Sequence, residues 1–202
     1  MTDKDTYKTI DKPSEEALFK DKNSKFYGYA FPVSNEDEVK QTIETLKKKH
    51  HAARHWCYAY QIGTEVLRYR ANDDGEPSNS AGMPIYGQIQ SFDLTNVLIV
   101  VVRYFGGVKL GVGGLINAYR TAAQMTLSEA KIIEKTIDKV FKLEFNYNQM
   151  NIVMRIIKEK QLKITAQKLE QSCLLEISVR KGNANQIFSI FDNIHGITIS
   201  EL

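Results

Sequence analysis

A glycine-rich stretch near the middle of the sequence is the first candidate for a binding site. Five glycines fall within nine residues, and basic and aromatic residues surround them. Glycine at this density lets the backbone adopt positive φ or lets another group approach the main chain closely. Arginine and lysine beside free backbone amides can hold phosphate, and aromatic rings can stack on unpaired bases. The residues concerned are Arg103, Tyr104, Phe105, Gly106, Gly107, Lys109, Gly111, Gly113, Gly114, Tyr119 and Arg120.

Two interpretations of this stretch remain open. Neither the dinucleotide fingerprint nor the Walker motif fits, because Ile116 and Val112 stand where a glycine and a lysine are required. In one interpretation the glycines only form a tight connection, the aromatic residues are core, and Arg103 pairs with an acidic loop. In the other, the stretch binds an anion, because free amides at a helix N-terminus attract negative charge.

An acidic loop, Asp73, Asp74, Glu76 and Ser78, is the second candidate. Closely spaced carboxylates could ligate a hard cation or supply a general acid and base. The calcium-loop pattern is absent, and Asp-Asp-Gly-Glu-Pro is ordinary turn chemistry, so the sequence favours a structural turn over a metal site. In such a turn, Glu76 or Asp74 would cap the following helix or hold Arg103.

A cysteine and a histidine form the third candidate. His55 and Cys57 are two residues apart on a predicted strand, so they share a face. A nucleophilic pair is conceivable, but such neighbours rarely align for proton transfer, and we expect a buried cysteine beside a hydrogen-bonded histidine. His50, His51 and His55 lie in lysine-rich surroundings that do not favour a metal cluster. We expect no metal and no cofactor.

Hydrophobic periodicity indicates the elements that position these residues. The apolar, β-branched run at 97–102 predicts a strand buried on both faces. After Gly114, apolar residues at three- and four-residue spacing predict a helix. Ser34 is a plausible N-cap for an earlier helix. Further elements are expected as strands at 7–10, 25–33, 54–62 and 65–70, a polar loop at 72–80 and a helix at 81–92.

The pattern restarts as a smaller unit after a boundary near residues 131–135, which predicts domains 1–132 and 133–202. Strands are expected at 140–147, 162–169, 174–179 and 197–202, and helices at 149–160 and 181–194. This order is βαββαβ, the ferredoxin-like pattern. The fold class is therefore α+β, with a βαβ-type N-terminal domain and a ferredoxin-like C-terminal domain.

Composition places the protein among soluble globular chains. Of 202 residues, 43% are hydrophobic and 25% charged. The net charge of +3 does not by itself argue for nucleic acid. No apolar run approaches the length of a membrane span, and the N-terminus lacks a secretory core. With only two distant cysteines, Cys57 and Cys173, we expect a cytoplasmic protein with reduced thiols.

Three motifs, in order, resemble those of the IMPACT family: HWCYAY at 55–60, DDGEPSNSAGMPI at 73–85, and RYFGG, KLG, GGL and AY across 103–119. The resemblance extends over the whole chain, the second half by pattern, as in the two-domain, YigZ-like bacterial members. It implies a first domain with a fold shared by ribosomal proteins and domain IV of elongation factor G. It also implies a ferredoxin-like second domain similar to that factor's neighbouring domain.

The resemblance implies a link to translation or RNA and no established catalytic set. Eukaryotic members block activation of an amino-acid-starvation kinase through an extra N-terminal domain for which this chain has no room, so that role is not expected. We predict a non-enzymatic, translation-associated regulator that binds RNA or the ribosome. Its expected contacts are Arg103, Tyr104, Gly106, Gly107, Lys109, Gly111, Gly113, Gly114 and Arg120.

Two alternatives and two departures from the family accompany this prediction. The chain could instead be a hydrolase or peptidase that uses the loop at 73–78 with His55 or Cys57. It could also bind a protein partner through the open face of the second sheet. Asn79-Ser80 replace the Gly-Thr usual in the family, and Asn117 replaces an arginine. Loss of that arginine removes one phosphate contact.

Overall fold

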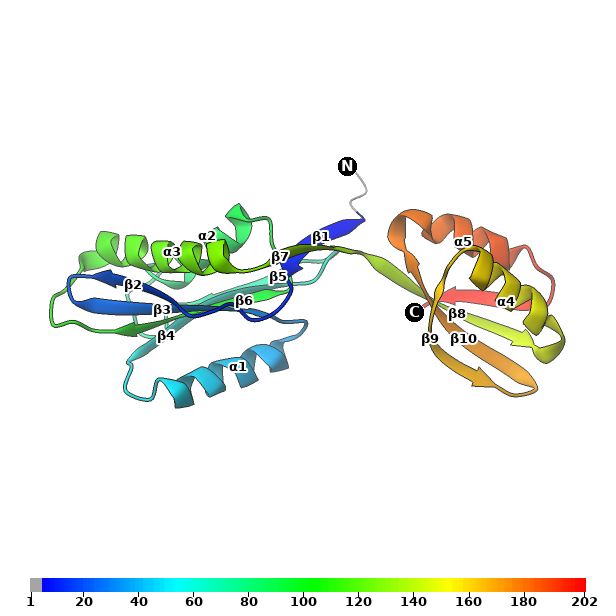
Figure 1. Ribbon diagram of the computed structural model, residues 1–202, viewed down its shortest axis with the longest axis horizontal. Helices are drawn as coiled ribbons and strands as arrows, with labels where there is room; N and C mark the ends of the chain where they lie inside the picture. The colour runs from blue at the N-terminus through cyan, green and yellow to red at the C-terminus, as the bar shows by residue number, and fades with distance from the viewer. Residues whose placement is uncertain (1–4) are drawn as a thin grey trace. The chain divides into compact units, whose positions relative to one another are not determined.

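The computed structural model describes residues 5–202, which form two compact units (Figure 1). The first unit is Tyr7–Lys135, and the second contains the chain from Thr136 onward together with Asp5 and Thr6. Each unit has its own hydrophobic core and contains both helices and strands, which confirms the α+β class. Among residues 5–202, no helix is long and apolar enough to cross a membrane.

A five-stranded antiparallel sheet forms the centre of the first unit. Its order is β2-β3-β6-β4-β5. Because β3 and β4 both pair antiparallel with β6, they are parallel to each other, and β3-α1-β4 is a βαβ unit with β6 inserted between its strands. The strands are β2 (Ala17–Asp21), β3 (Ser24–Pro32), β4 (His55–Ile62), β5 (Arg68–Asn72) and β6 (Val97–Tyr104).

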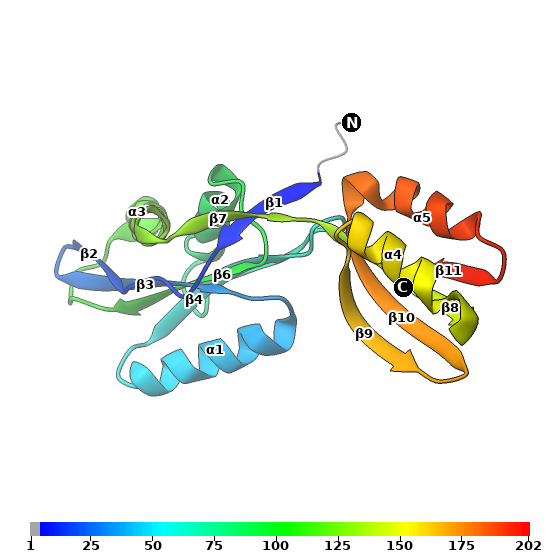
Figure 2. The same ribbon diagram turned by 45° about the vertical axis from the view of Figure 1, so that its right-hand side comes forward.

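Helices cover both faces of this sheet. Figure 2 shows α1 (Glu36–Lys49) on one side, and α2 (Gly82–Ser91) and α3 (Gly111–Glu129) on the other. The central strand β6 therefore packs both ways. Val97, Ile99 and Val101 belong to the core beneath α2 and α3, whereas Leu98, Val100 and Val102 belong to the core beneath α1. All six are fully buried, which confirms the prediction of a strand buried on both faces.

Three local features differ from the sequence-based expectation. The strand β2 was not anticipated. The N-cap of α1 is Asn35 rather than Ser34: the side chain of Asn35 accepts hydrogen bonds from two amides of the first turn, while the Ser34 hydroxyl bonds to Glu38. The helix α3 begins at Gly111, so three of the five glycines belong to its first turn.

A two-stranded sheet pairs β1 (Thr6–Ile10) with β7 (Ile132–Thr136). The first of these strands was expected at 7–10. The second occupies the segment where the sequence pattern restarts.

The second unit has the predicted order βαββαβ. Its antiparallel sheet, in the order β11-β8-β10-β9, alternates buried and outward residues, and α4 and α5 contribute to a single core. Short 3₁₀ turns, Tyr147–Gln149 and Lys181–Asn183, precede the two helices. The elements are β8 (Asp138–Asn146), α4 (Met150–Glu159), β9 (Lys163–Leu169), β10 (Ser172–Arg180), α5 (Ala184–Asp192) and β11 (Ile197–Glu201).

Candidate functional site

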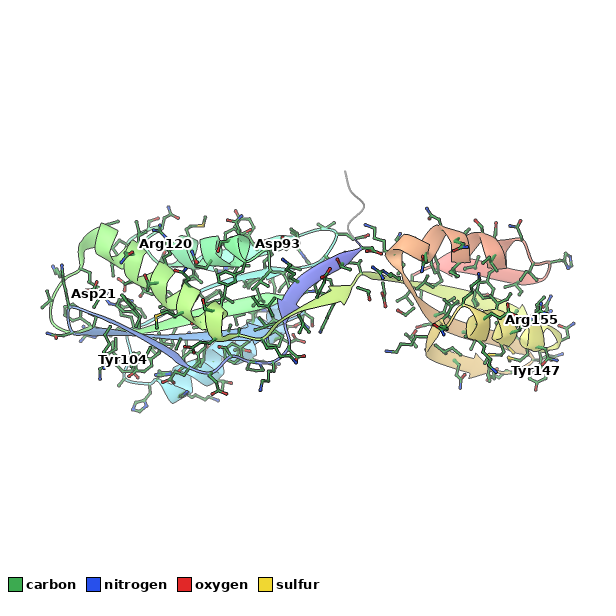
Figure 3. All side chains as sticks on the ribbon, turned by 45° about the horizontal axis from the view of Figure 1, so that its top comes forward. Asp21, Asp93, Tyr104, Arg120, Tyr147 and Arg155 are labelled. Atoms are coloured by element: carbon green, nitrogen blue, oxygen red, sulfur yellow. The ribbon has the colours of Figure 1, made fainter. Side chains whose placement is uncertain are left out.

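One end of the five-stranded sheet gathers most of the residues singled out in the sequence. There β6 ends, with Tyr104 opposite Lys25 at the start of β3 and Arg103 opposite His55 at the start of β4. The helix α1 ends and α3 begins at this end (Figure 1). We call it the glycine-turn end and define it by residues 21–24, 50–54 and 105–110. In Figure 3, Asp21 and Tyr104 lie toward this end and Asp93 toward the opposite one.

Three of the glycines have steric or conformational reasons to be glycine. A Cβ atom on Gly106 would lie 2.1 Å from the carbonyl carbon of Asn23, and the Gly106 amide donates to the Ser24 hydroxyl at 3.1 Å. Gly107 and Gly111 have φ values of +86° and +74°, which side chains rarely adopt. These positions fit the interpretation of a tight connection.

Gly113 has no such reason. Its φ is not in the left-handed region, and no atom lies within 4 Å of the position that its Cβ would occupy. It lies in the exposed first turn of a helix, where alanine would cost less conformational entropy. The packing of the unit therefore does not account for the bare backbone at this position.

The N-terminus of α3 lacks an internal cap. The N-cap residue, Leu110, offers no side-chain acceptor. Among residues 5–202, no group accepts a hydrogen bond from the amides of Gly111, Val112 or Gly113. Lys109 is exposed beside them and pairs with no carboxylate of the described chain. Free amides, the helix dipole and a lysine together favour a negatively charged group.

Arg120 lies on α3, but it does not share one phosphate site with these amides. It is nine residues beyond Gly111, which places it about 13 Å along the helix axis. Gly113, Asn117 and Arg120 have the spacing of one helix face, and all three are exposed. We call Lys109, Gly113, Asn117 and Arg120 the α3 face. Gly113, Asn117 and Arg120 thus form a row along α3, and Lys109 lies in the chain just before its first turn.

Arg103 points into the unit, and the structure shows it paired with the acidic loop. Its guanidinium donates to Glu76 Oε1 at 2.6 Å, and the two side chains are only 7% and 5% exposed. The Tyr119 hydroxyl donates to the same oxygen at 2.7 Å. Of the two interpretations that the sequence left open for Arg103, the ion pair is the one observed. Tyr104 is half-buried and contacts His50 on the α1 side of the sheet.

The carboxylates of the acidic loop hold the loop itself together. Asp73 accepts from the amides of Ala81 and Gly82, at 2.9 and 2.8 Å, and so caps α2. Asp74 accepts from the Trp56 amide at 2.7 Å. Of the two roles expected for Glu76 or Asp74, Glu76 holds Arg103, while the cap of α2 comes from Asp73. The chain turns at Asp74, where φ is 42°.

These contacts support the structural-turn interpretation of the loop. Ser78 is exposed. Within residues 5–202, no group of three histidine, cysteine, aspartate or glutamate side chains could hold a metal ion.

Cys57 and His55 do not form a nucleophilic pair. The Cys57 thiol donates to the Asp73 carbonyl at 3.0 Å and contacts the Tyr119 hydroxyl at 3.3 Å. His55 Nδ1 donates to the Asp74 carbonyl at 2.8 Å. Burial raises the pKa of the Cys57 thiol far above its usual range, so the thiolate is disfavoured. The arrangement matches the expected buried cysteine beside a hydrogen-bonded histidine.

A second polar network, which the sequence analysis missed, lies on the α1 side of the glycine-turn end. Tyr29 donates to Glu16, and its hydroxyl lies 2.6 Å from His50 Nε2. His50 Nδ1 lies 3.0 Å from the Tyr104 hydroxyl. Lys49 donates to Glu16 at 3.0 Å. The sequence did carry one sign of this network. Aromatic residues alternate along β3, which places Tyr27 and Tyr29 on the same face of the sheet.

The surroundings of His50 disfavour its charged form. Burial lowers its pKa, and the nearby Lys49 lowers it further. Because Tyr29 donates its proton to Glu16, His50 Nε2–H donates to the Tyr29 oxygen, and in the neutral ring Nδ1 accepts from Tyr104. Beside the network is an open cavity of about 560 Å³, lined by Glu16, Asn23, Lys25, Tyr27, His50, Tyr104 and Phe105.

Comparison with known proteins identifies the family. The Impact N-terminal domain matches residues 22–127. The IMPACT family member YvyE of Bacillus subtilis is 35% identical over 156 residues, which cover 77% of this chain and 71% of the relative. The chain belongs to the IMPACT family. This confirms the resemblance read from the three motifs.

Other relatives of this IMPACT family protein extend the comparison. A family member from Haemophilus influenzae is 32% identical over 83% of each chain. YigZ of Escherichia coli is 28% identical over 78% of each chain. A crystal structure of a hypothetical protein, 24% identical, superposes with a TM-score of 0.74 and covers 98% of this chain and 97% of that one. That likeness shows the two-unit α+β fold.

The three IMPACT motifs meet inside the first unit. Cys57 comes from the first motif, Asp73 and Glu76 from the second, and Arg103 and Tyr119 from the third. Their hydrogen bonds form one internal network. Much of the family resemblance therefore reflects how this IMPACT family protein folds, and the exposed glycine turn and α3 face remain as the candidate binding surface.

Proposed function

We propose that this protein is a non-enzymatic, translation-associated regulator that acts in the cytoplasm and binds RNA or the ribosome through the glycine turn and the α3 face. The observation that carries the proposal is Gly113. This glycine lies in the first turn of a helix that has no side-chain cap, and packing does not require a glycine there. A phosphate could approach the amides there without meeting a side chain.

An RNA backbone suits the row of contacts on α3. Lys109 and the amides of the first turn could bind one phosphate, and Arg120, about 13 Å further along the helix, would bind another. Arg103 has a positioning role, because its buried ion pair with Glu76 fixes the end of β6 from which the glycine turn starts. A single phosphorylated metabolite would not span the row, whereas a polyanion would.

Family membership supplies the link to translation. The relatives include eukaryotic proteins named IMPACT; that of the rat is 34% identical over 96 residues, which cover 45% of this chain and 30% of the relative. The family resemblance connects such proteins with translation. The hydrolase alternative is disfavoured because Asp73, Asp74 and Glu76 form hydrogen bonds inside the first unit. The proposed role is therefore binding.

Co-sedimentation with bacterial ribosomes across a range of salt concentrations tests this proposal. We expect binding at low salt and release as salt rises, because phosphate contacts displace counterions. The double variant Lys109→Ala with Arg120→Ala should weaken binding and lower the slope of log K against log salt by roughly 1.5. The matched control, Arg155→Ala with Lys158→Ala on α4 of the second unit, also removes two exposed charges and should bind like the unmodified protein. Equal binding by both variants would overturn the proposal.

A further inference from the structure

The cavity on the α1 side of the glycine-turn end has a rigid floor. His50 is 7% exposed and bonds through both ring nitrogens, to Tyr29 at 2.6 Å and to Tyr104 at 3.0 Å. The Tyr104 ring also packs edge-on against Tyr27, with ring centroids 5.7 Å apart. Because hydrogen bonds fix these rings before any ligand arrives, little side-chain entropy remains to be lost on binding.

The rim of the cavity combines an exposed ring with groups of opposite charge. Phe105 is 48% exposed and directly precedes the glycine turn. Lys25 lies opposite Tyr104 in the sheet and is exposed. Elsewhere on the lining, Glu16 Oε2 accepts hydrogen bonds from both Tyr29 and Lys49. Among residues 5–202, no group donates a hydrogen bond to Glu16 Oε1. Tyr29 and Lys49 lower the pKa of Glu16, so its carboxylate stays ionised.

We propose that this cavity binds an unpaired nucleobase of single-stranded RNA. The base stacks on aromatic side chains of the lining, chiefly Phe105 at the rim and Tyr27 of the floor, and its exocyclic amino group donates to Glu16 Oε1. The adjoining phosphate stays at the rim beside Lys25. This inference rests on the proposed function and adds a base pocket to the phosphate contacts on α3.

The chemistry of the lining selects this ligand. Aromatic rings stack on the faces of bases and commonly bind single strands in this way. A volume of about 560 Å³ lies within the range of small-ligand pockets. The Glu16 carboxylate repels a phosphate from its part of the lining and favours a hydrogen-bond donor there. Adenine, cytosine and guanine carry an amino group and uracil does not, so we expect oligoadenylate to bind more tightly than oligouridylate.

A fluorescent oligonucleotide tests the base pocket directly. The probe is an oligouridylate of about eight nucleotides that carries one 2-aminopurine, whose emission falls when it stacks on another ring. Uridines stack weakly, so the free probe is bright before it binds. We expect the unmodified protein to quench the probe. Phe105→Leu keeps an apolar side chain without a ring and should lose the quenching and bind about fivefold or more weakly. The control Tyr147→Leu removes an exposed ring, 65% accessible, from the second unit and should change neither.

The charge of Glu16 provides a second readout. In Glu16→Gln we expect the preference for oligoadenylate over oligouridylate to shrink, while binding of oligouridylate stays within about twofold of the unmodified protein. If binding depends on salt but Phe105→Leu and Tyr147→Leu quench the probe equally, the proposal of a base pocket is overturned. The proposed function would then still stand. Absence of binding to both ribosomes and oligonucleotides would overturn both proposals.

Discussion

The buried Glu76 carboxylate joins the second and third family motifs through its bonds to Arg103 and Tyr119. It receives a charged hydrogen bond from Arg103 and a neutral one from Tyr119, in surroundings that exclude water. A buried guanidinium is tolerable only while its partner carries the opposite charge. The same carboxylate that looked like a candidate acid or base in the sequence thus serves to neutralise a buried cation.

Substitution of this carboxylate should therefore cost much of the stability of the first unit. We expect Glu76→Gln to lower the free energy of unfolding by about 3 to 5 kcal/mol, because Arg103 is left buried and uncompensated. Denaturant unfolding near neutral pH measures this. Ser78→Ala, in the same loop but exposed, should stay within about 0.5 kcal/mol of the unmodified protein. A similar small loss in both variants would show that the ion pair contributes little.

His50 should make stability depend on pH. Its pKa is lowered in the folded protein by burial, and Lys49 adds to the effect while Glu16 opposes it. A lowered histidine pKa means that the unfolded chain takes up the proton first. The contribution is therefore complete above the unfolded value of about 6.5 and is lost as pH falls through it toward the folded value. Protonation would also turn His50 Nδ1 into a donor, so the Tyr104 hydroxyl would have to accept this hydrogen bond.

Unfolding of the full chain at about pH 7.5 and about pH 5.5 measures this contribution. We expect the free energy of unfolding to fall more over this interval in the unmodified protein than in His50→Gln. Carboxylates whose pKa values are lowered, such as Asp5 and Asp11, lose their contribution only at lower pH and do not disturb the comparison. An identical decrease in both proteins would exclude His50 as the source.

At the scale of elements, α3 has two faces with different demands. Its inner face packs against the sheet so closely that a Cβ atom on Gly28 of β3 would lie 2.0 Å from the Thr126 hydroxyl. Its outer face and the start of its first turn are exposed, and an exposed glycine such as Gly113 lowers helix stability. Gly28 is therefore needed for close packing of β3 against α3, whereas Gly113 is not needed for packing and leaves the backbone open to a ligand.

Gly113→Ala separates stability from binding at this helix. Alanine fits without a clash and favours the helix by up to about 1 kcal/mol, so we expect unchanged or raised stability. Ribosome co-sedimentation should nevertheless weaken, because the new methyl group blocks approach to the amides. Gly87→Ala on α2 is the matched control, since that glycine also has open space at its Cβ position. If neither variant binds ribosomes more weakly than the unmodified protein, the main support for a phosphate at the start of α3 is removed.

At the scale of the whole molecule, both proposed contact surfaces lie in the first unit. The family match at residues 22–127 falls within the same unit. The second unit has a separate core and an outward sheet face bearing residues such as Glu144, Glu176 and Thr198. Separate cores mean that substitutions on α3 should leave the second unit folded, which is why Arg155, Lys158 and Tyr147 serve as controls.

The sequence by itself determined the elements and the fold class. Period-two and period-3.6 patterns reflect burial of one face, so they located β6, the βαββαβ order and most helices within a few residues. Strand β2 escaped notice because it is short and its inner residue, Ala17, carries little hydrophobic signal. The sequence also indicated that Arg103 and the acidic loop could pair.

Only the tertiary structure decided how these residues are used. Glu76, Arg103, Tyr119 and Cys57 are far apart in the chain, and their contact depends on strand register and on the packing of α3, which no local pattern encodes. The His50 network likewise joins a loop, a helix end and two strands. Local preferences act over a few residues, whereas a binding surface arises where distant segments are brought to one end of a sheet.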